Sequence, residues 1–334
     1  MSKKQKKTDH YSGIGGQAVI EGIMMKNQDK YSVAVRTPDG DIDVIVEEYE
    51  PFAPARILKK IPFVRGVFNF IDSLIIGMRT LNHSASYYEE EKDTHKKEKI
   101  FDRIFKDNAD KVLSAVSVFF SVIIAVALFM LAPYFLARML DKYVQSETMI
   151  AIIEGVLRVI IFVVYVVAIS LLKDIQRVFM YHGAEHKCIN CIENGYALNV
   201  ANVRNSSRPH KRCGTSFLFY VVFISVILFI FIRVDEPVMR VVIRLLLVPV
   251  IAGIAYEIIR LAAVSNNIIV KILSAPGMWL QRLTTKEPDD KMIEVAIAAV
   301  EAVFDWREYF YTEFGIDIDG VHADENAADL ENQV

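Results

Sequence analysis

The sequence predicts a mainly α-helical, polytopic membrane protein with about four transmembrane helices and a small β-containing cytoplasmic unit at its N-terminus. Three observations predict this class: long apolar blocks in the middle of the chain, loops that alternate in basic content, and short strand-like segments near the start. The composition agrees, with 53% hydrophobic residues and a mean hydropathy of +0.29 over 334 residues. So many long apolar runs exceed what the core of a soluble protein needs.

Residues 1–50 are expected to form the β-rich unit. Strand-like patterns cover residues 17–25, 31–36 and 41–47, and residues 37–41 have the composition of a turn. The glycine run from Gly13 to Gly16 resembles part of a dinucleotide fingerprint, but no strand precedes it and no long helix follows, which argues against a nucleotide site. The glycines are better explained by a tight turn or by close approach to another element, with Glu21 on a strand that could reach a metal site.

Residues 51–111 are expected to hold an amphipathic helix and a charged linker. Apolar residues recur at helical spacing over residues 57–88 around Arg65, Asn69, Asp72 and Arg79, which favours a helix on the bilayer surface or against the bundle over a fifth span. Residues 89–111 read as a solvated linker.

Residues 112–264 contain four blocks long enough to cross a bilayer, at residues 112–140, 149–172, 216–232 and 237–263. The segment before the first block and the loop at residues 173–215 are rich in Lys and Arg, whereas residues 141–148 carry only Lys142 and the turn at Asp235 and Glu236 is acidic. This alternation predicts a multi-pass protein of the cell membrane with both termini in the cytoplasm. The polar start lacks the apolar stretch of a cleavable signal peptide. Residues 265–334 are expected to form a cytoplasmic helix at 290–310 and an acidic tail.

The loop at residues 173–215 contains a candidate metal site. His182 and His186 are four residues apart, so a helix places them on one face with Glu185 beside them. The order His-x-x-Glu-His is that of the inverted zinc-peptidase signature, in which the histidines bind zinc and the glutamate activates a water molecule. The alternative is a helix end at the membrane surface where these polar residues bind nothing.

A catalytic zinc usually has three protein ligands, so a third ligand is needed. His210 and Cys213 are the first choice, because they lie in the same loop and end at the start of the third block. Glu257, in the fourth block, is a second choice, because an ionisable residue within a span must be paired, hydrated or bound to metal; Arg244 or Arg260 could pair with it.

The remaining cysteines are a third choice for the ligand. Cys188 and Cys191 point away from His182 on a straight helix, which favours packing roles over a second metal or a redox role. Three cysteines in a cytoplasmic protein argue for free thiols or metal ligands over a disulfide.

Other charged residues have simpler interpretations. Glu154 and Arg158, four apart in the second block, favour a structural ion pair over a transport role. The loop arginines could bind a phosphate or an anionic lipid head group, although membrane topology alone explains them; they are Arg204, Arg208 and Arg212, with Lys211 between them. The net charge of -3 says little, because membrane topology explains the basic loops and the acidic residues collect in the tail from Asp317 onward; a nucleic-acid partner is not expected.

Several sequence blocks resemble those of the YqhQ-like bacterial membrane proteins: GGQAVIEGIMM at 15–25, HGAEHK at 182–187, NVR at 202–204, HKRCGTS at 210–216 and PGMWLQRLTT at 276–285. The resemblance extends over nearly the whole chain. It implies a domain of unknown function that is usually labelled a predicted metal-dependent enzyme, and it implies no substrate. The matching positions include His182, Glu185, His186, His210 and Cys213, whereas Cys188 and Cys191 depart from what family members often have.

Taken together, the sequence predicts a divalent metal site, with zinc expected, at the cytoplasmic membrane surface. The expected activity is hydrolysis of a peptide or lipid-linked substrate, with Glu185 as the base and Glu21 or Glu257 as further support. Two alternatives remain open. If His182, His186, His210 and Cys213 all bind one ion, the site is closed and the protein is a metal-stapled scaffold that binds partners. Charged residues within the spans would instead suit a transporter.

Overall fold

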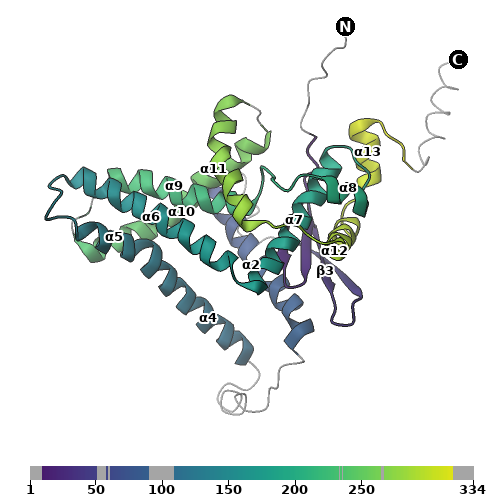
Figure 1. Ribbon diagram of the computed structural model, residues 1–334, viewed down its shortest axis with the longest axis horizontal. Coiled ribbons are helices and arrows are strands. Elements are labelled where there is room, and N and C mark those ends of the chain that lie inside the picture. Colours follow the sequence, from purple (N-terminus) through teal and green to yellow (C-terminus); the bar gives the residue numbers. More distant parts are fainter. Residues whose placement is uncertain are drawn as a thin grey trace, which may run out of the picture.

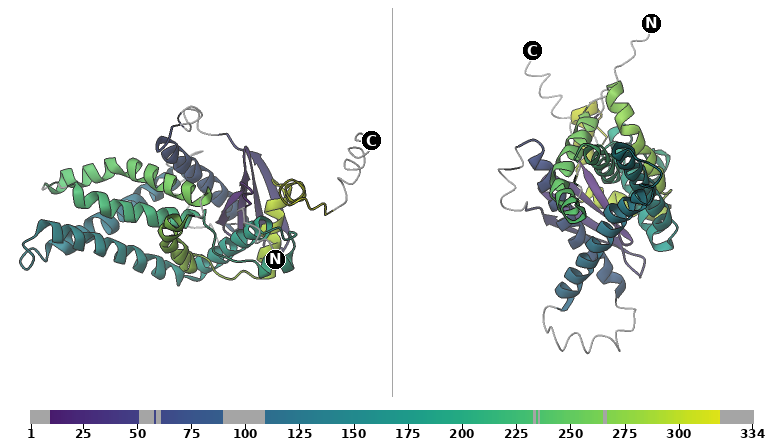
Figure 2. Two further views of the ribbon diagram at one scale, coloured as in Figure 1. Left: turned by 90° about the horizontal axis from the view of Figure 1, so that it is seen from above. Right: turned by 90° about the vertical axis from the view of Figure 1, so that its left-hand side faces the viewer.

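The computed structural model describes residues 10–50, 58, 61–89, 109–232, 234, 236–264 and 267–318. A helical bundle occupies one end of the molecule, and a sheet with its covering helices occupies the other (Figures 1 and 2). Most of the linker predicted at 89–111, Asp235 and the tail beyond residue 318 lie outside the described residues.

The sheet is antiparallel and has four strands in the order of the sequence: β1 (Gly15–Val19), β2 (Gly22–Asn27), β3 (Lys30–Arg36) and β4 (Ile42–Glu48). The prediction of a single strand over residues 17–25 was therefore wrong. Glu21 has a φ of 50°, and the chain reverses there. A side chain on Gly22 would lie 2.3 Å from the carbonyl oxygen of Ala34, so only glycine fits after the turn.

Both faces of the sheet are covered, because successive side chains point to opposite sides. On one side, Ile23 and Met25 share a core with α7 (Lys173–Glu193) and α12 (Asp290–Glu301). On the other side, Met24 and Val33 pack with Ile76 of α2 (Val64–Glu89). The sheet thus packs against α7 and α12 on one face and against α2 on the other.

Four segments of the described chain are long and apolar enough to cross a membrane: Ala115–Arg138, Glu147–Ser170, Gly214–Phe231 and Val238–Ala262. The first is built from α4 (Ala109–Val126), the π-helical η2 (Ala127–Leu131) and α5 (Ala132–Arg138). The others are α6 (Glu147–Ser170), α9 (Gly214–Phe231) and α10 (Pro237–Val264). Figure 1 shows α6, α9 and α10 running together while α4 slants away from them.

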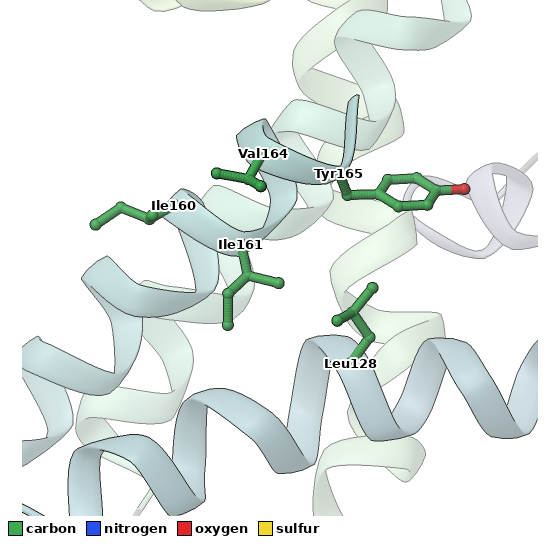
Figure 3. A pocket seen from close by; sticks show the side chains of 5 residues that line it. All are labelled: Leu128, Ile160, Ile161, Val164 and Tyr165. Carbon is green, nitrogen blue, oxygen red and sulfur yellow. The ribbon is translucent and has the colours of Figure 1, made fainter. Parts of the chain in front are cut away.

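A cavity of about 290 Å³ lies where the first span meets α6 (Figure 3). Its lining comprises Leu128, Ile160, Ile161, Val164 and Tyr165. The surface of this cavity is almost entirely apolar, and the phenol of Tyr165 is the one ionisable group among these five residues.

The buried charges of the bundle form one cluster. Oε1 of Glu154 accepts a hydrogen bond from Arg158 at 2.7 Å and forms an ion pair with Arg244 of α10 at 2.6 Å. Nε of Arg158 also donates to the carbonyl oxygen of Phe129 in η2, at 2.9 Å. The Glu154–Arg158 pair predicted from the sequence is present, and Arg244 extends it across two helices.

Two further helices differ from expectation. The helix predicted at 290–310 is broken into α12 and α13 (Trp306–Phe314), because Asp305 caps the second helix by accepting from the backbone N–H groups of Arg307 and Glu308. Residues 265–289 had no predicted helix, yet α11 (Ile268–Thr284) crosses the direction of α9 and packs against it (Figure 1). The short α8 (Val200–Asn205) follows α7.

Candidate metal centre

Helix α7 carries the His-x-x-Glu-His sequence at the junction between the bundle and the sheet. Neighbouring elements bury this part of the helix continuously from Gly183 to Ile192, since β1 and α12 pack on it. At Gly183 the packing is closest: a Cβ there would lie 2.0 Å from the carbonyl oxygen of Lys286. The helix therefore holds His186 in the interior, while His182 is partly exposed.

The two histidines of α7 are both oriented by backbone carbonyl groups. Nδ1 of His182 lies 2.9 Å from the carbonyl oxygen of Thr284, and Nδ1 of His186 lies 2.7 Å from that of Arg208. A carbonyl oxygen only accepts, so each Nδ1 carries the proton and each Nε2 carries a lone pair. Donation of the outer N–H to a fixed acceptor is the usual way in which proteins orient a metal-binding histidine.

Cys213 completes a group of three. Nε2 of His182 lies 3.2 Å from Sγ of Cys213, and one ligand atom from each of His182, His186 and Cys213 lies within 4.8 Å of the others. Burial acts to raise the pKa of the Cys213 thiol, but the imidazole of His186 and hydrogen bonds from Thr215 outweigh it, so the pKa is lower than that of an ordinary thiol. A thiol of this kind is readily deprotonated to a metal-binding thiolate.

Two buried polar atoms of this region have no hydrogen-bond partner in the described chain: Nε2 of His186 and Oε2 of Glu185. The carboxylate of Glu185 receives a hydrogen bond from the backbone N–H of Gly16 on β1. Burial raises the pKa of Glu185 to about 7, and it lowers the pKa of His186. Unpaired buried polar groups cost free energy, and these two lie on adjacent residues of α7.

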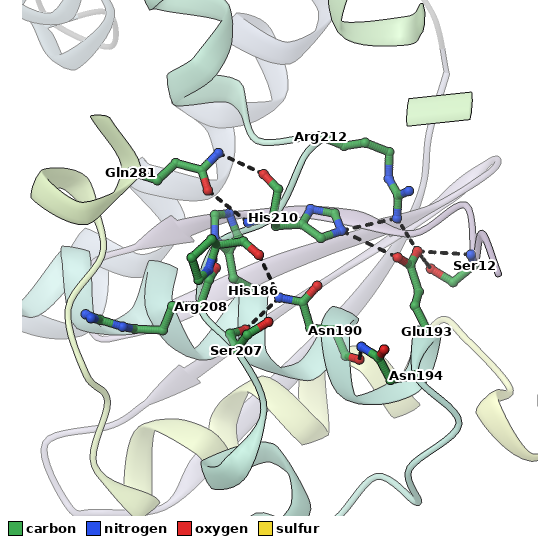
Figure 4. A network of polar contacts seen from close by, with 11 residues as sticks. Ser12, His186, Asn190, Glu193, Asn194, Ser207, Arg208, His210, Arg212 and Gln281 are labelled. Carbon is green, nitrogen blue, oxygen red and sulfur yellow. Dashed lines mark hydrogen bonds and ion pairs between the residues drawn. The ribbon is translucent and has the colours of Figure 1, made fainter. Parts of the chain in front are cut away.

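His210 lies beside the group of three rather than in it. Its ring centroid is 5.6 Å from that of His186, and its Nε2 is 3.6 Å from Oε2 of Glu193 (Figure 4). Glu193 also accepts from Ser12 and from Arg212. The backbone of His210 is held by Gln281 of α11, which donates to its carbonyl oxygen at 2.8 Å. Burial lowers the pKa of His210.

The loop that bears Cys213 is held to α7 by the same network. Nδ2 of Asn190 donates to the carbonyl oxygens of Ser207 and Pro209, on either side of the Arg208 carbonyl that orients His186 (Figure 4). The roles of Gly16, Asn190 and Gln281 were not predicted from the sequence. The glycine run and the block at 276–285 were the available signals, and neither indicated a partner.

The two glutamates expected as further ligands lie elsewhere. Glu21 forms an ion pair with Arg177 and accepts a hydrogen bond from the hydroxyl group of Tyr181, so it connects the turn after β1 to α7. Glu257 accepts from Nε of Arg65 at 2.6 Å and from the backbone N–H of Phe63. Glu257 therefore pairs with Arg65 of α2. Of the two partners considered from the sequence, Arg244 pairs with Glu154 instead.

Cys188 and Cys191 are fully buried in the core that α7 shares with the sheet. Burial raises the pKa of both thiols, that of Cys191 to about 11. Neither belongs to the three-residue group, and their surroundings are those of packing residues.

Each of the arginines considered for anion binding already has a carboxylate partner. Arg204 pairs with Asp290, Arg208 with Glu287 at 3.1 Å, and Arg212 with Glu193. These pairs join the loop to α7, α12 and the segment before α12. The arrangement favours a role in holding the loop.

Fold and site together define the class: a mainly helical protein with four candidate membrane-spanning helices, a small antiparallel sheet and a buried His/Cys group between them. Residues 61–306 match the family model "Protein of unknown function (DUF1385)", and the chain belongs to this family. It is 36% identical over 288 residues to "Uncharacterized protein YqhQ" of Bacillus subtilis (strain 168), with 85% of this chain and 89% of that protein covered. The family expected from the sequence is confirmed. No solved structure matched the chain.

Proposed function

We propose that this protein is a zinc-dependent hydrolase of the cell membrane, with His182, His186 and Cys213 as the zinc ligands. One observation carries the proposal: both histidines donate Nδ1–H to backbone carbonyls, which leaves their Nε2 lone pairs on the side of Cys213, and that of His186 is buried without a partner. Neutral imidazoles together with a thiolate form a donor set that suits zinc.

The number of ligands favours catalysis over a structural role. Catalytic zinc sites use three protein ligands and keep one position for water, whereas structural sites use four. His210 would be the fourth ligand of a closed site, but its Nε2 is near Glu193 and Arg212. A zinc ion in the open site would lower the pKa of a bound water molecule toward about 7.

Glu185 is the proposed general base. The Gly16 N–H fixes its carboxylate, and Oε2 has no partner and can accept a proton. β1 and α7 pack against each other, so this carboxylate lies between two regular elements. The proposed substrates are peptides or lipid-linked molecules with a carbonyl or phosphoryl group.

The proposed location follows from the four apolar helices and the basic loops. With both termini in the cytoplasm, the start of α9 and the end of α6 would place Cys213 and α7 at the cytoplasmic membrane surface. A substrate anchored in the inner leaflet would reach this level without leaving the bilayer.

The test is the zinc content of detergent-purified protein, measured by elemental mass spectrometry. Wild type, Glu185→Gln and Cys191→Ala are expected to retain about one zinc per chain, while His182→Ala and Cys213→Ala are expected to lose it. Cys191→Ala is the matched control for Cys213→Ala, since both remove a buried thiol. Absence of zinc and of other divalent metals from freshly purified wild type would exclude the metalloenzyme.

A hydrolysis screen with zinc-loaded protein then separates enzyme from scaffold. Glu185→Gln should abolish turnover with zinc retained. If the protein is a scaffold, His210→Ala should also lose zinc, no turnover should be found in wild type, and Glu185→Gln should leave the zinc content unchanged. A transporter would depend on Glu257, but its pairing with Arg65 at the junction of α2 and α10 favours a structural role.

A further inference from the structure

The start of α2 lies against the candidate membrane-spanning part of α10. A Cβ on Gly66 would lie 2.7 Å from Cβ of Tyr256, and a Cβ on Gly253 would lie 2.6 Å from the carbonyl oxygen of Phe63. Glycine at both positions allows the two segments to approach this closely. Gly253 precedes the end of the candidate span at Ala262 by nine residues, which is about 13 Å along a helix. The start of α2 therefore lies well within the length of this span.

A contact with α9 agrees with this depth. The ring centroids of Phe70 and Phe217 are 5.1 Å apart. Phe217 belongs to the first turn of α9, which begins at Gly214, so Phe70 lies near the end of the bundle that faces the sheet. Seven residues carry α2 from Phe63 to Phe70, a rise of about 10 Å. The helix thus leaves the level of the spans and then packs on the sheet through Ile76 (Figure 1).

The backbone N–H groups at the start of α2 have acceptors within the chain. Those of Val64, Arg65 and Gly66 donate to carbonyl oxygens of the turn before the helix, at 2.8, 3.0 and 3.1 Å. The N–H group of Phe63 and the guanidinium group of Arg65 donate to Glu257. A helix in water can leave its first N–H groups to the solvent, whereas a segment in hydrocarbon must satisfy them internally. The start of α2 meets the second requirement.

The exposed surface of this part of the chain is apolar. Between residues 61 and 78 no charged side chain is exposed; the exposed residues are Ile61, Pro62, Phe63, Ile71, Ser73, Leu74, Ile75 and Met78. Phe63 is 55% exposed. The first exposed charged side chain of α2 is Arg79, which lies beyond the level of the spans. Large apolar side chains without charged neighbours are unfavourable in water and suit contact with hydrocarbon.

We propose that the first two turns of α2 and the turn before them are inserted into the cytoplasmic leaflet beside α10, with Ile61 and Phe63 against lipid hydrocarbon chains. Since β4 and the later turns of α2 belong to one sheet unit, this segment enters and leaves the membrane on the same side. It anchors the sheet, including the strand that holds Glu185, at the membrane surface. The inference rests on the membrane location that is part of the proposed function, but it does not depend on zinc or on hydrolysis.

The experiment measures the surroundings of spin labels in full-length protein, reconstituted into vesicles of phosphatidylcholine and phosphatidylglycerol. Oxygen concentrates in hydrocarbon and a nickel chelate stays in water, so the ratio of their collision rates with a label reports its depth. Ile61→Cys and Phe63→Cys are the test variants, and Leu81→Cys is the matched variant further along α2. The references are Leu246→Cys in α10, 70% exposed, and Val46→Cys in β4, 49% exposed.

The labels of the test variants should lose most of the nickel collisions found at Leu81 and should match the label at Leu246. The label at Leu81 should match that at Val46. The three native cysteines are buried, so unsubstituted protein gives the background labelling. Denaturant unfolding checks that each variant is folded, and two test positions are used so that misfolding of one leaves the other.

Two results would overturn the inference, and they differ in what they leave standing. If the labels at Ile61 and Phe63 match that at Val46 while the label at Leu246 is in hydrocarbon, α2 lies outside the bilayer and the membrane location of the protein stands. If the label at Leu246 is itself in water, the membrane location in the proposed function fails together with the insertion of α2.

Discussion

Two buried polar clusters of this protein differ in whether their groups are satisfied. In the bundle, Glu154 pairs with Arg158 and Arg244, and Arg158 also reaches the carbonyl oxygen of Phe129. Beside α7, Nε2 of His186 and Oε2 of Glu185 have no partner in the described chain. Both clusters are nearly inaccessible to water, so the cost of an unpaired group is high in each.

This difference is the basis for the proposal that the first cluster is structural and the second binds a metal. A cluster whose groups pair with one another needs nothing from outside and holds helices together. In the second cluster the outer N–H groups of both histidines are fixed and the inner nitrogen of His186 has no partner in the described chain, which is the arrangement that the proposed metal site needs. Burial and polarity alone do not separate the two cases.

The largest effect is expected where the complete cluster is broken. Glu154→Gln removes the only carboxylate that bridges Arg158 and Arg244 in the described chain, and the free energy of unfolding should fall by roughly 3–5 kcal/mol. Denaturant unfolding in detergent measures this, with Glu147→Gln, whose carboxylate is 62% exposed, as control. Zinc content per folded chain should stay unchanged. Loss of zinc with stability retained would invert the assignment of the two clusters.

The next effect concerns the support of the incomplete cluster. Gln281 is fully buried and bonds both the N–H and the carbonyl group of His210. Gln281→Ala leaves these backbone groups unpaired, and the free energy of unfolding should fall by about 1–3 kcal/mol. Gln176→Ala, whose amide makes a single 3.3 Å bond near the surface, is the control and should have little effect. Equal stability of the two variants would show that the loop is not held by α11.

Local patterns were enough to predict the candidate spans and the face shared by His182, Glu185 and His186. Apolar length and helical period are properties of consecutive residues. The acceptors of the two histidines could not be predicted in this way. Thr284 is 102 residues from His182, and a backbone carbonyl group leaves no signal in the sequence. Helix α11 was missed because Pro276 and Gly277 lie inside it, where they ordinarily end a helix.

Charge partners were the least predictable feature. Arg65 and Glu257 are 192 residues apart, and the nearer arginines of the same span were the only candidates that spacing could offer. Similarly, the turn at Glu21 lies within an apolar run whose only turn residue is Gly22. In both cases the tertiary contact decides the conformation.

A smaller effect is expected at the strand that holds Glu185. A Cβ on Gly16 would lie 2.6 Å from the carbonyl oxygen of Met24 and 3.1 Å from the carboxyl carbon of Glu185, whereas one on Gly15 meets nothing within 4 Å. Gly16→Ala should therefore lower the free energy of unfolding by about 1–2 kcal/mol, and Gly15→Ala should leave it unchanged. Zinc should remain bound in both, because Glu185 is not a proposed ligand. Identical unfolding curves for Gly16→Ala and Gly15→Ala would show that β1 does not pack closely against Glu185.

The smallest effect should come from an exposed pair outside both clusters. Arg204 and Asp290 are 53% and 52% exposed, so water competes for both charges. Arg204→Gln should lower the free energy of unfolding by at most about 1 kcal/mol, and a double-mutant cycle with Asp290→Asn in low and high salt measures the coupling. A coupling energy as large as the stability lost in Glu154→Gln would mean that exposure does not decide how strongly a charge pair contributes. A small, salt-sensitive value would confine the strong electrostatic interactions to buried groups, where a missing partner has a measurable cost.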